Sequence, residues 1–395
     1  MKRFQITALL LALLCLLSGC GFISDSYVSV TEHYDPYAYK EETEPGETEP
    51  PDEEPLQTVG NYYSMLELLR SFVTEGVEHG QFLFGQFSGD REETLKDAFY
   101  AIKYEDPVGA YAIDYIEYSH TQQNNAWLVT VDTVYRRSAS EIQAIQSVRG
   151  NDRALRQIYD TLDQNGAAVT LQISGYQDED FAARIRAYCL EHPNTVVELP
   201  EISVAVYPES GNVRIAELHF TYETDKETLR GMQAEAESVL SSAERYAQYA
   251  PDDATKLSLI YSYLTSRFRY SEDEENGSVY RLLCEGVGNS ESFSSVAAYL
   301  CRRVGLDCLL VEGSRTRGET PASASDLAEE DESENRYVWV IVCIDGYYYH
   351  WDVQQDALDG LQECRLLLDA EMEGYDWDRE AFPVCDGVTV KQEEP

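Results

Sequence analysis

The sequence of 395 residues predicts an α+β protein: two small tandem units of the order α-β-α-β-β, followed by a larger mixed domain. Three observations support this prediction. Similar apolar patterns recur at an offset of about 87 residues between residues 59 and 235. A helical pattern, a strand and a hairpin follow one another over residues 290–352. An acidic, proline-rich stretch without apolar periodicity separates the N-terminus from these regions.

The first 20 residues have the pattern of a lipoprotein signal peptide. Lys2 and Arg3 are basic, residues 6–17 are apolar, and Leu17-Ser-Gly-Cys20 ends the segment. This ending resembles the bacterial lipobox, which implies that Cys20 is lipidated after cleavage and that the chain is held at the outer face of the cytoplasmic membrane. A single uncleaved anchor helix is the weaker alternative, because the apolar run is short for a bilayer.

Residues 21–58 are rich in Glu, Pro, Thr and Tyr, and we expect a disordered acidic tether. The whole chain has a formal net charge of −42. Such a charge disfavours nucleic acid and anionic lipid headgroups as partners, so membrane contact is expected through the anchor at Cys20. The acidic runs at 272–275 and 329–332 lack the ligand spacing of an EF-hand, and no metal or cofactor is predicted.

The chain has nine cysteines without a CxxC pair or a zinc pattern. Cys301, Cys308 and Cys343 lie in apolar patterns and are expected to be packing thiols. The sequence leaves open one disulfide bridge that involves Cys364 or Cys385.

The two predicted units cover residues 59–145 and 146–235. Each starts with an amphipathic helix, marked by Leu69 in the first unit and Ile158 in the second. A short strand, a second helix and two more strands follow in each unit. The last two strands are expected to pair antiparallel, with helices on one face of the sheet. Units this small bury only modest cores, so we expect them to pack on a neighbour.

Residues 236–390 are predicted to form the third domain, entered through a helix over about 225–249. Ser290 or Ser292 can cap a helix that Gly305 ends, a short strand begins at Cys308, and residues 337–344 and 347–352 form a hairpin. A helix start that faces the end of a hairpin suits Cys-His-Asp chemistry, since a helix N-terminus lowers a thiol pKa.

The spacing within this domain resembles the bacterial transglutaminase-like family, which has a papain-like fold. The residues that carry the resemblance are Tyr280, Gly286, Ser290, Cys301, Gly305, Leu306, Cys308, Trp339, Asp345-Gly346 and Asp352. In that family the helix opens with the nucleophilic Cys, and the His stands two residues before the Trp. The matching positions here are Ser290 and Tyr337, and the third position keeps its carboxylate as Asp352. The resemblance therefore implies a triad without thiol and imidazole, because a phenol is neutral at pH 7 and a serine needs an adjacent base.

Three functions remain open from the sequence. The first is a non-catalytic binding module for a polypeptide or a cell-wall component, with Tyr337, Trp339, Tyr348 and His350 as cleft contacts. The second is an enzyme of acyl transfer or hydrolysis that uses Ser290 with Asp352 and with His350, or a base from another subunit, as the rescue base. We favour a partly exposed strand position for His350 over that role. The third is a scaffold in which the tandem units bind the partners.

Overall fold

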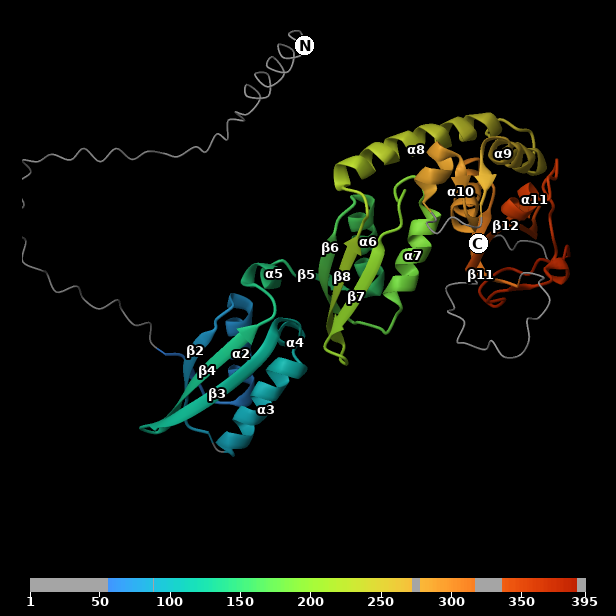
Figure 1. The fold of residues 1–395 in the computed structure, drawn as a ribbon. Helices are drawn as coiled ribbons and strands as arrows, with labels where there is room; N and C mark the ends of the chain where they lie inside the picture. The colour runs from blue at the N-terminus through green and yellow to red at the C-terminus, as the bar shows by residue number, and fades with distance from the viewer. Residues whose placement is uncertain (1–55, 88, 272–277, 317–335, 389–395) are drawn as a thin grey trace, which may run out of the picture. The chain divides into compact units, whose positions relative to one another are not determined.

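The computed structural model describes residues 56–87, 89–271, 278–316 and 336–388 (Figure 1). The predicted signal peptide, Cys20, almost all of the tether and the two acidic runs at 272–275 and 329–332 lie outside these ranges. Among the helices in the described ranges, none combines the length and apolar character needed to cross a membrane.

The described chain forms three sheet-and-helix units, which we call the first, second and third layers. The first layer is a four-stranded sheet with two main helices. Its elements are β1 (Thr58–Val59), α2 (Tyr62–Glu75), β2 (His79–Phe84), α3 (Arg91–Tyr104), α4 (Pro107–Ala112), β3 (Ile113–Gln123) and β4 (Ala126–Tyr135), followed by α5 (Ala139–Gln143). The strand order is β1-β2-β4-β3, in which only the edge pair β1 and β2 is parallel. Alternate residues of β2 and β4, such as Phe82 and Val129, are fully buried against α2 and α3.

The second layer has the same plan. It contains β5 (Gln146–Arg149), α6 (Asn151–Asp163), β6 (Ala168–Ser174), α7 (Phe181–Glu191), β7 (Glu201–Tyr207) and β8 (Val213–Thr221). The strand order is β5-β6-β8-β7, again with one parallel edge pair, β5 and β6. Leu171, Ile158 and Ile185 belong to its own buried cluster, so this layer has a core of its own.

The third layer starts with two long helices and ends in an antiparallel sheet. Its elements are α8 (Lys226–Ala247), α9 (Asp253–Arg267), β9 (Arg269–Tyr270), a π-helical turn η1 (Arg281–Glu285), β10 (Val287–Gly288), α10 (Ser290–Arg303), β11 (Cys308–Arg315), β12 (Arg336–Ile344), β13 (Tyr347–Trp351), α11 (Val353–Leu358), a 3-10 turn η2 (Asp369–Glu371) and β14 (Tyr375–Asp376). The sheet order is β13-β12-β11-β14, with every pair antiparallel. The domain boundary expected between residues 235 and 236 falls inside α8. All buried residues of α8 pack into the core of this layer, so the helix belongs to it as a whole.

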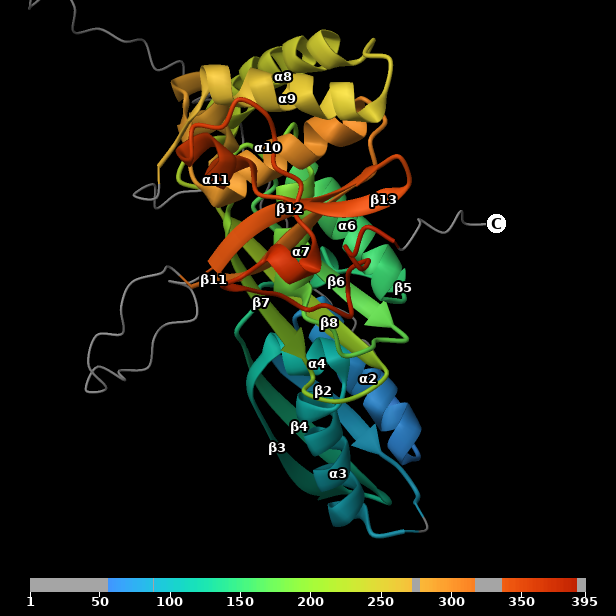
Figure 2. The same cartoon turned by 90° about the vertical axis from the view of Figure 1, so that its right-hand side faces the viewer.

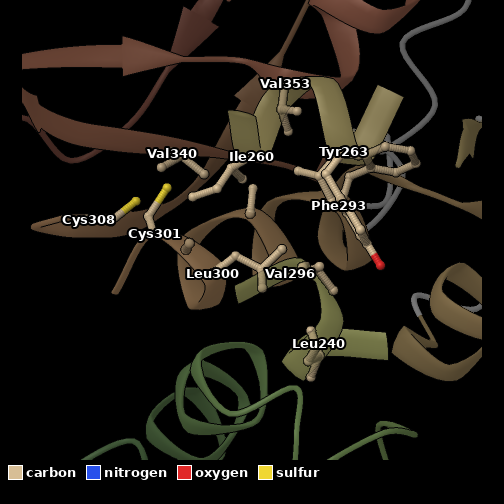
Figure 3. Close-up of a cluster of buried hydrophobic side chains, with 14 of the residues drawn as sticks. Leu240, Ile260, Tyr263, Phe293, Val296, Leu300, Cys301, Cys308, Val340 and Val353 are labelled. Carbon is tan, nitrogen blue, oxygen red and sulfur yellow. The ribbon is translucent and has the colours of Figure 1, made fainter. Parts of the chain in front are cut away.

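Helix α10 lies between the α8 and α9 helices and the sheet (Figure 2). Phe293, Val296 and Leu300 of α10 belong to the main core, to which β12 contributes Val340 (Figure 3). The helix starts at Asn289, whose side chain accepts a hydrogen bond from the Ser292 amide at 3.1 Å. The cap is therefore Asn289, and the expected caps Ser290 and Ser292 are the first and third residues of the helix.

The central strand β12 is buried on both faces. Val340 and Val342 face α10, whereas Trp339 and Ile341 face a second, smaller core that includes Met372, Trp377 and Cys385. The second core is closed by the irregular segment after α11, in which only η2 and β14 form. This division decides which side chains of the hairpin can approach the start of α10.

The start of α10 is also fixed from the second layer. Arg186 on α7 forms an ion pair with Glu291 and another with Glu312 of β11, at 3.2 Å. In the next turn of the helix, the buried Ser295 hydroxyl donates to the Leu190 carbonyl of α7. The helix start is thus held by α7 through an ion pair and a buried hydrogen bond.

Candidate functional site

Asp352 is the centre of a buried polar cluster at the end of β13. Its carboxylate accepts hydrogen bonds from the Tyr337 hydroxyl at 3.0 Å to each oxygen and from the Tyr375 hydroxyl at 2.5 Å. It also caps α11 by accepting the Gln355 amide at 3.0 Å, and Arg315 lies 3.8 Å away. The structure therefore brings together two of the three predicted site residues, Tyr337 and Asp352.

Burial and hydrogen bonding determine the protonation states of Asp352 and Tyr337. Burial raises the pKa of Asp352, and the hydrogen bonds from Tyr375 and Gln355 act in the opposite direction. Burial and the neighbouring Asp352 raise the pKa of the Tyr337 hydroxyl well above its ordinary value. A phenol with a raised pKa keeps its proton at neutral pH, so Tyr337 is a hydrogen-bond donor and cannot act as a general base.

Ser290 occupies the first turn of α10 and is almost fully buried. Ser294, one turn later on the same helix face, donates to the Val338 carbonyl at 2.8 Å, so this face lies along the beginning of β12. In the described part of the chain, no hydrogen bond joins the Ser290 hydroxyl to Tyr337, His350 or Asp352. None of these three groups therefore accepts the proton of the Ser290 hydroxyl.

His350 differs from the expectation of a partly exposed strand residue, because its side chain is completely buried. The indole N–H of Trp339 donates to Nδ1 of His350 at 3.0 Å, and Nε2 lies 2.8 Å from Asp369 Oδ1. An indole can only donate, so Nδ1 holds a lone pair and Nε2 carries the proton given to Asp369. Both nitrogens are occupied, on the sheet face opposite α10, and His350 cannot serve Ser290 as a base.

The same histidine stands in a group of three possible metal ligands. The ligand atoms of His350, Asp369 and Cys385 lie within 4.8 Å of one another. The nitrogen that faces the other two is the protonated Nε2, and a metal there would require loss of the indole bond or an imidazolate. The contacts therefore favour a hydrogen-bonded core, and this cluster was not foreseen in the sequence.

Two more of the expected cleft contacts, Trp339 and Tyr348, lie in different parts of the fold. Trp339 is completely buried, with its ring against Tyr375 and Trp377 in the second core. Tyr348 pairs with Cys343 near the turn of the hairpin and donates to Asp307 at 3.1 Å. Cys343 is six residues from Tyr337, which corresponds to roughly 20 Å along the strand. Trp339 is therefore a core residue, whereas Tyr348 is partly exposed at the other end of the strand pair from Tyr337.

Three further residues of the site were missed by the sequence reasoning. Tyr375 comes from β14 and completes the donors to Asp352, Asp369 fixes His350, and Arg315 stacks on the rings of Tyr337 and Tyr375. Tyr375 and Asp369 lie in the irregular C-terminal segment. No periodicity marks such a segment, and only the density of aromatic residues there was a signal.

The seven cysteines of the described ranges are all free thiols, including Cys364 and Cys385. Cys301 and Cys308 are buried beside one another in the main core (Figure 3). Mainly because of this burial, the pKa of the Cys301 thiol is raised well above its ordinary value. A thiol with a raised pKa is a poor nucleophile at neutral pH. These residues match the expectation of packing thiols.

We expect His350 to stay neutral in the folded protein at pH values where a free histidine is protonated. Burial lowers its pKa from the ordinary value of 6.5. The unfolded chain takes up a proton below pH 6.5 and the folded chain does not, so the stabilisation by this residue is present above pH 6.5 and is lost as the pH falls. Nitrogen-15 NMR of the imidazole should show a protonated Nε2 throughout this range.

The chain unfolded in urea is the reference, and there the His350 imidazole should titrate near its ordinary pKa of 6.5. An Nδ1-protonated tautomer in the folded protein would contradict the assignment, because Trp339 could not then donate to that nitrogen.

A sequence profile of the transglutaminase-like superfamily matches residues 241–353. Comparison with curated proteins gives no match. Among solved structures, the chain is similar to a candidate cysteine protease from Cytophaga hutchinsonii, with 11% identity, a TM-score of 0.24, and coverage of 45% of this chain and 70% of that one. It is also similar to a TGase, with 11% identity, a TM-score of 0.24, and coverage of 75% and 78%. A candidate protease from Parabacteroides distasonis shares 8% identity with a TM-score of 0.23, and coverage is 70% of this chain and 38% of that one.

The profile ends one residue after Asp352 and includes Ser290 and Tyr337. Of α8, it includes only the last part, residues 241–247. Residues 241–353 are therefore identified as a transglutaminase-like domain.

Proposed function

We propose that this protein is a membrane-anchored, extracytoplasmic lipoprotein whose transglutaminase-like domain binds a polypeptide or a cell-wall component without turning it over. One observation carries the proposal: the Tyr337 phenol donates to Asp352 at the position where the family has its imidazole. A triad needs a group that accepts a proton from the nucleophile and an aspartate that orients that group. Here the aspartate accepts from a donor, and within the described ranges no histidine is hydrogen-bonded to Ser290.

The anchor is supported by the sequence alone. The lipobox-like ending at Cys20 and the acidic tether after it favour a body held away from the bilayer at the outer face of the cytoplasmic membrane. We also propose that the two N-terminal layers are copies of one unit. The offset of about 87 residues and the shared strand order, with one parallel edge pair in each sheet, support a tandem origin.

The absence of turnover is tested with a serine-reactive fluorophosphonate and with amine incorporation into glutamine peptides. We expect no labelling of Ser290 and no incorporation above the level of Ser290→Ala, because nothing removes the serine proton. Labelling that disappears in Ser290→Ala would instead establish an enzyme, and the binding proposal would then be wrong.

Binding is tested by retention of isolated cell-wall material and envelope polypeptides on the immobilised full chain. Arg315 is a partly exposed cation beside Tyr337 and Asp352, so Arg315→Gln should reduce retention if a ligand lies over this cluster. Arg336→Gln is the matched control, since Arg336 is exposed on β12 near the same sheet end. Equal retention by both variants and the parent chain would count against this surface.

A further inference from the structure

A concave site with three arginines lies in the second layer, away from the transglutaminase-like domain. The cavity has a volume of about 570 Å³ and is lined by Ser147, Val148, Arg149, Arg153, Arg156, Gln157 and Ser174. These residues come from the edge strand β5, the first two turns of α6 and the end of β6, which are neighbours in the layer (Figure 2). Arg153 and Arg156 are three residues apart on α6, so both side chains leave the same face of the helix.

Among the residues that the structure describes, the three guanidinium groups have no acidic partner. Within the described ranges, Arg149 and Arg153 make no hydrogen bond or ion pair, and Arg156 only donates to the Asp152 carbonyl of its own helix at 3.3 Å. Elsewhere in this layer, Arg184 pairs with Glu179 and Arg214 pairs with Asp178. In a chain with 72 acidic and 30 basic residues, three unpaired arginines around one cavity are a local reversal of charge.

The fold does not require these arginines. The first layer has the same parallel edge strand followed by a helix, formed by β1 and α2. Its corresponding segment, residues 58–68, contains no basic residue, and α2 starts with a capping box at Asn61. In the second layer α6 starts at Gly150 with no side-chain cap. A layer of this plan therefore forms without positive charge at this place, so the three arginines are not required for folding.

The chemistry of the lining selects a ligand with several anionic oxygens. One bidentate guanidinium satisfies both oxygens of a carboxylate, so three such groups fit a phosphoryl group with three or four acceptor oxygens. The Ser147 hydroxyl can donate a further hydrogen bond, whereas the Ser174 hydroxyl already donates to the Val148 carbonyl at 3.2 Å. Gln157 adds a different requirement, because its side-chain oxygen is buried without a partner. A rotation of the Gln157 side chain would bring this oxygen into the cavity, where a ligand hydroxyl beside the phosphoryl group would supply the missing donor.

We propose that this cavity binds a phosphate ester that carries hydroxyl groups, such as a polyol or sugar phosphate. The three arginines hold the phosphoryl oxygens, and Gln157 accepts from a hydroxyl of the ester. The site lies outside residues 241–353 and does not rest on the function proposed for that domain.

The test is calorimetric titration of the full chain with glycerol 3-phosphate, inorganic phosphate and glycerol. We expect saturable binding of glycerol 3-phosphate, weaker binding of phosphate and none of glycerol. Arg153→Gln with Arg156→Gln should weaken glycerol 3-phosphate binding by about tenfold or more, because two charge-assisted contacts are lost. Binding should also weaken with added salt, since both arginines are exposed.

The matched control is Arg184→Gln with Arg214→Gln, which removes the same charge from the same layer but from paired residues. Gln157→Leu should weaken binding of glycerol 3-phosphate more than binding of phosphate. The proposal is overturned by absence of saturable binding, or by equal losses in the two double variants. Equal affinity for phosphate and glycerol 3-phosphate would overturn the assignment to an ester.

Discussion

The Asp356→Asn substitution is expected to raise the free energy of unfolding by about 2–3 kcal/mol at pH 8 and to have little effect at pH 4. Asp356 lies in α11, four residues after Asp352, and its side chain is 1% exposed. Burial raises its pKa from 3.8 to about 6, although the Arg365 amide donates to it at 2.8 Å. At pH 8 the folded protein therefore contains a buried carboxylate, whose charge is better solvated in the unfolded chain.

The sign follows from proton uptake. Between pH 3.8 and about pH 6 the folded chain binds this proton and the unfolded chain does not. The stabilising contribution of Asp356 is thus complete below pH 3.8 and is lost as the pH rises through about 6. Asparagine stays neutral at all these values and can still accept the Arg365 amide. It loses the ion pair with the half-exposed Arg365 side chain at 3.3 Å, which is worth at most about 1 kcal/mol.

Urea unfolding followed by tryptophan fluorescence at pH 4, 6 and 8 measures this difference. Three of the four tryptophans, Trp339, Trp351 and Trp377, lie in the third layer and report on its unfolding. Asp359→Asn is the matched control, because Asp359 pairs with the same arginine at 2.8 Å but is much more exposed. A gain in stability that does not change between pH 4 and pH 8 would show that Asp356 is not the titrating group.

The sequence could predict the local elements of the third layer. The helical spacing from Phe293 to Leu300, Gly305 after the helix and the Asp345-Gly346 turn each have a local physical cause, and the structure places α10, β12 and β13 where these patterns predict them. The pairing of Tyr337 with Asp352 followed from the resemblance. Both residues stand on neighbouring strands near one end of the sheet.

The burial of Trp339 and His350 could not be predicted from an alternation of buried and exposed residues along the strands. Every residue from Tyr337 to Ile344 is buried, so the usual alternation between an inner and an outer face is missing in β12. A continuous apolar run of this kind is a signal of a strand covered on both faces. The second cover comes from the segment around Met372, Trp377 and Cys385, which has no regular pattern of its own and whose contacts are long-range.

The Asp352→Ala substitution is expected to lower the free energy of unfolding by about 3–5 kcal/mol, since it removes the shared acceptor of a buried cluster. The hydroxyls of Tyr337 and Tyr375 would lose their acceptor, and α11 would lose its cap. Leaving buried donors without a partner costs more than the net value of a hydrogen bond, and a lost cap costs about 1 kcal/mol more. Asp369→Ala is a control at an aspartate that is more exposed, and a smaller loss is expected there.

A double-mutant cycle separates this structural role from a general loss of packing. Tyr337→Phe alone removes one donor and leaves the carboxylate with Tyr375 and the Gln355 amide. If Tyr337 and Asp352 act as a unit, the double variant should lose less than the sum of the single losses, by about 1–2 kcal/mol. Strict additivity would mean that the phenol does not depend on the carboxylate. The position of the Asp352 carboxylate beside Tyr337 would then have no structural explanation, and the proposal of a non-catalytic site would lose its physical basis.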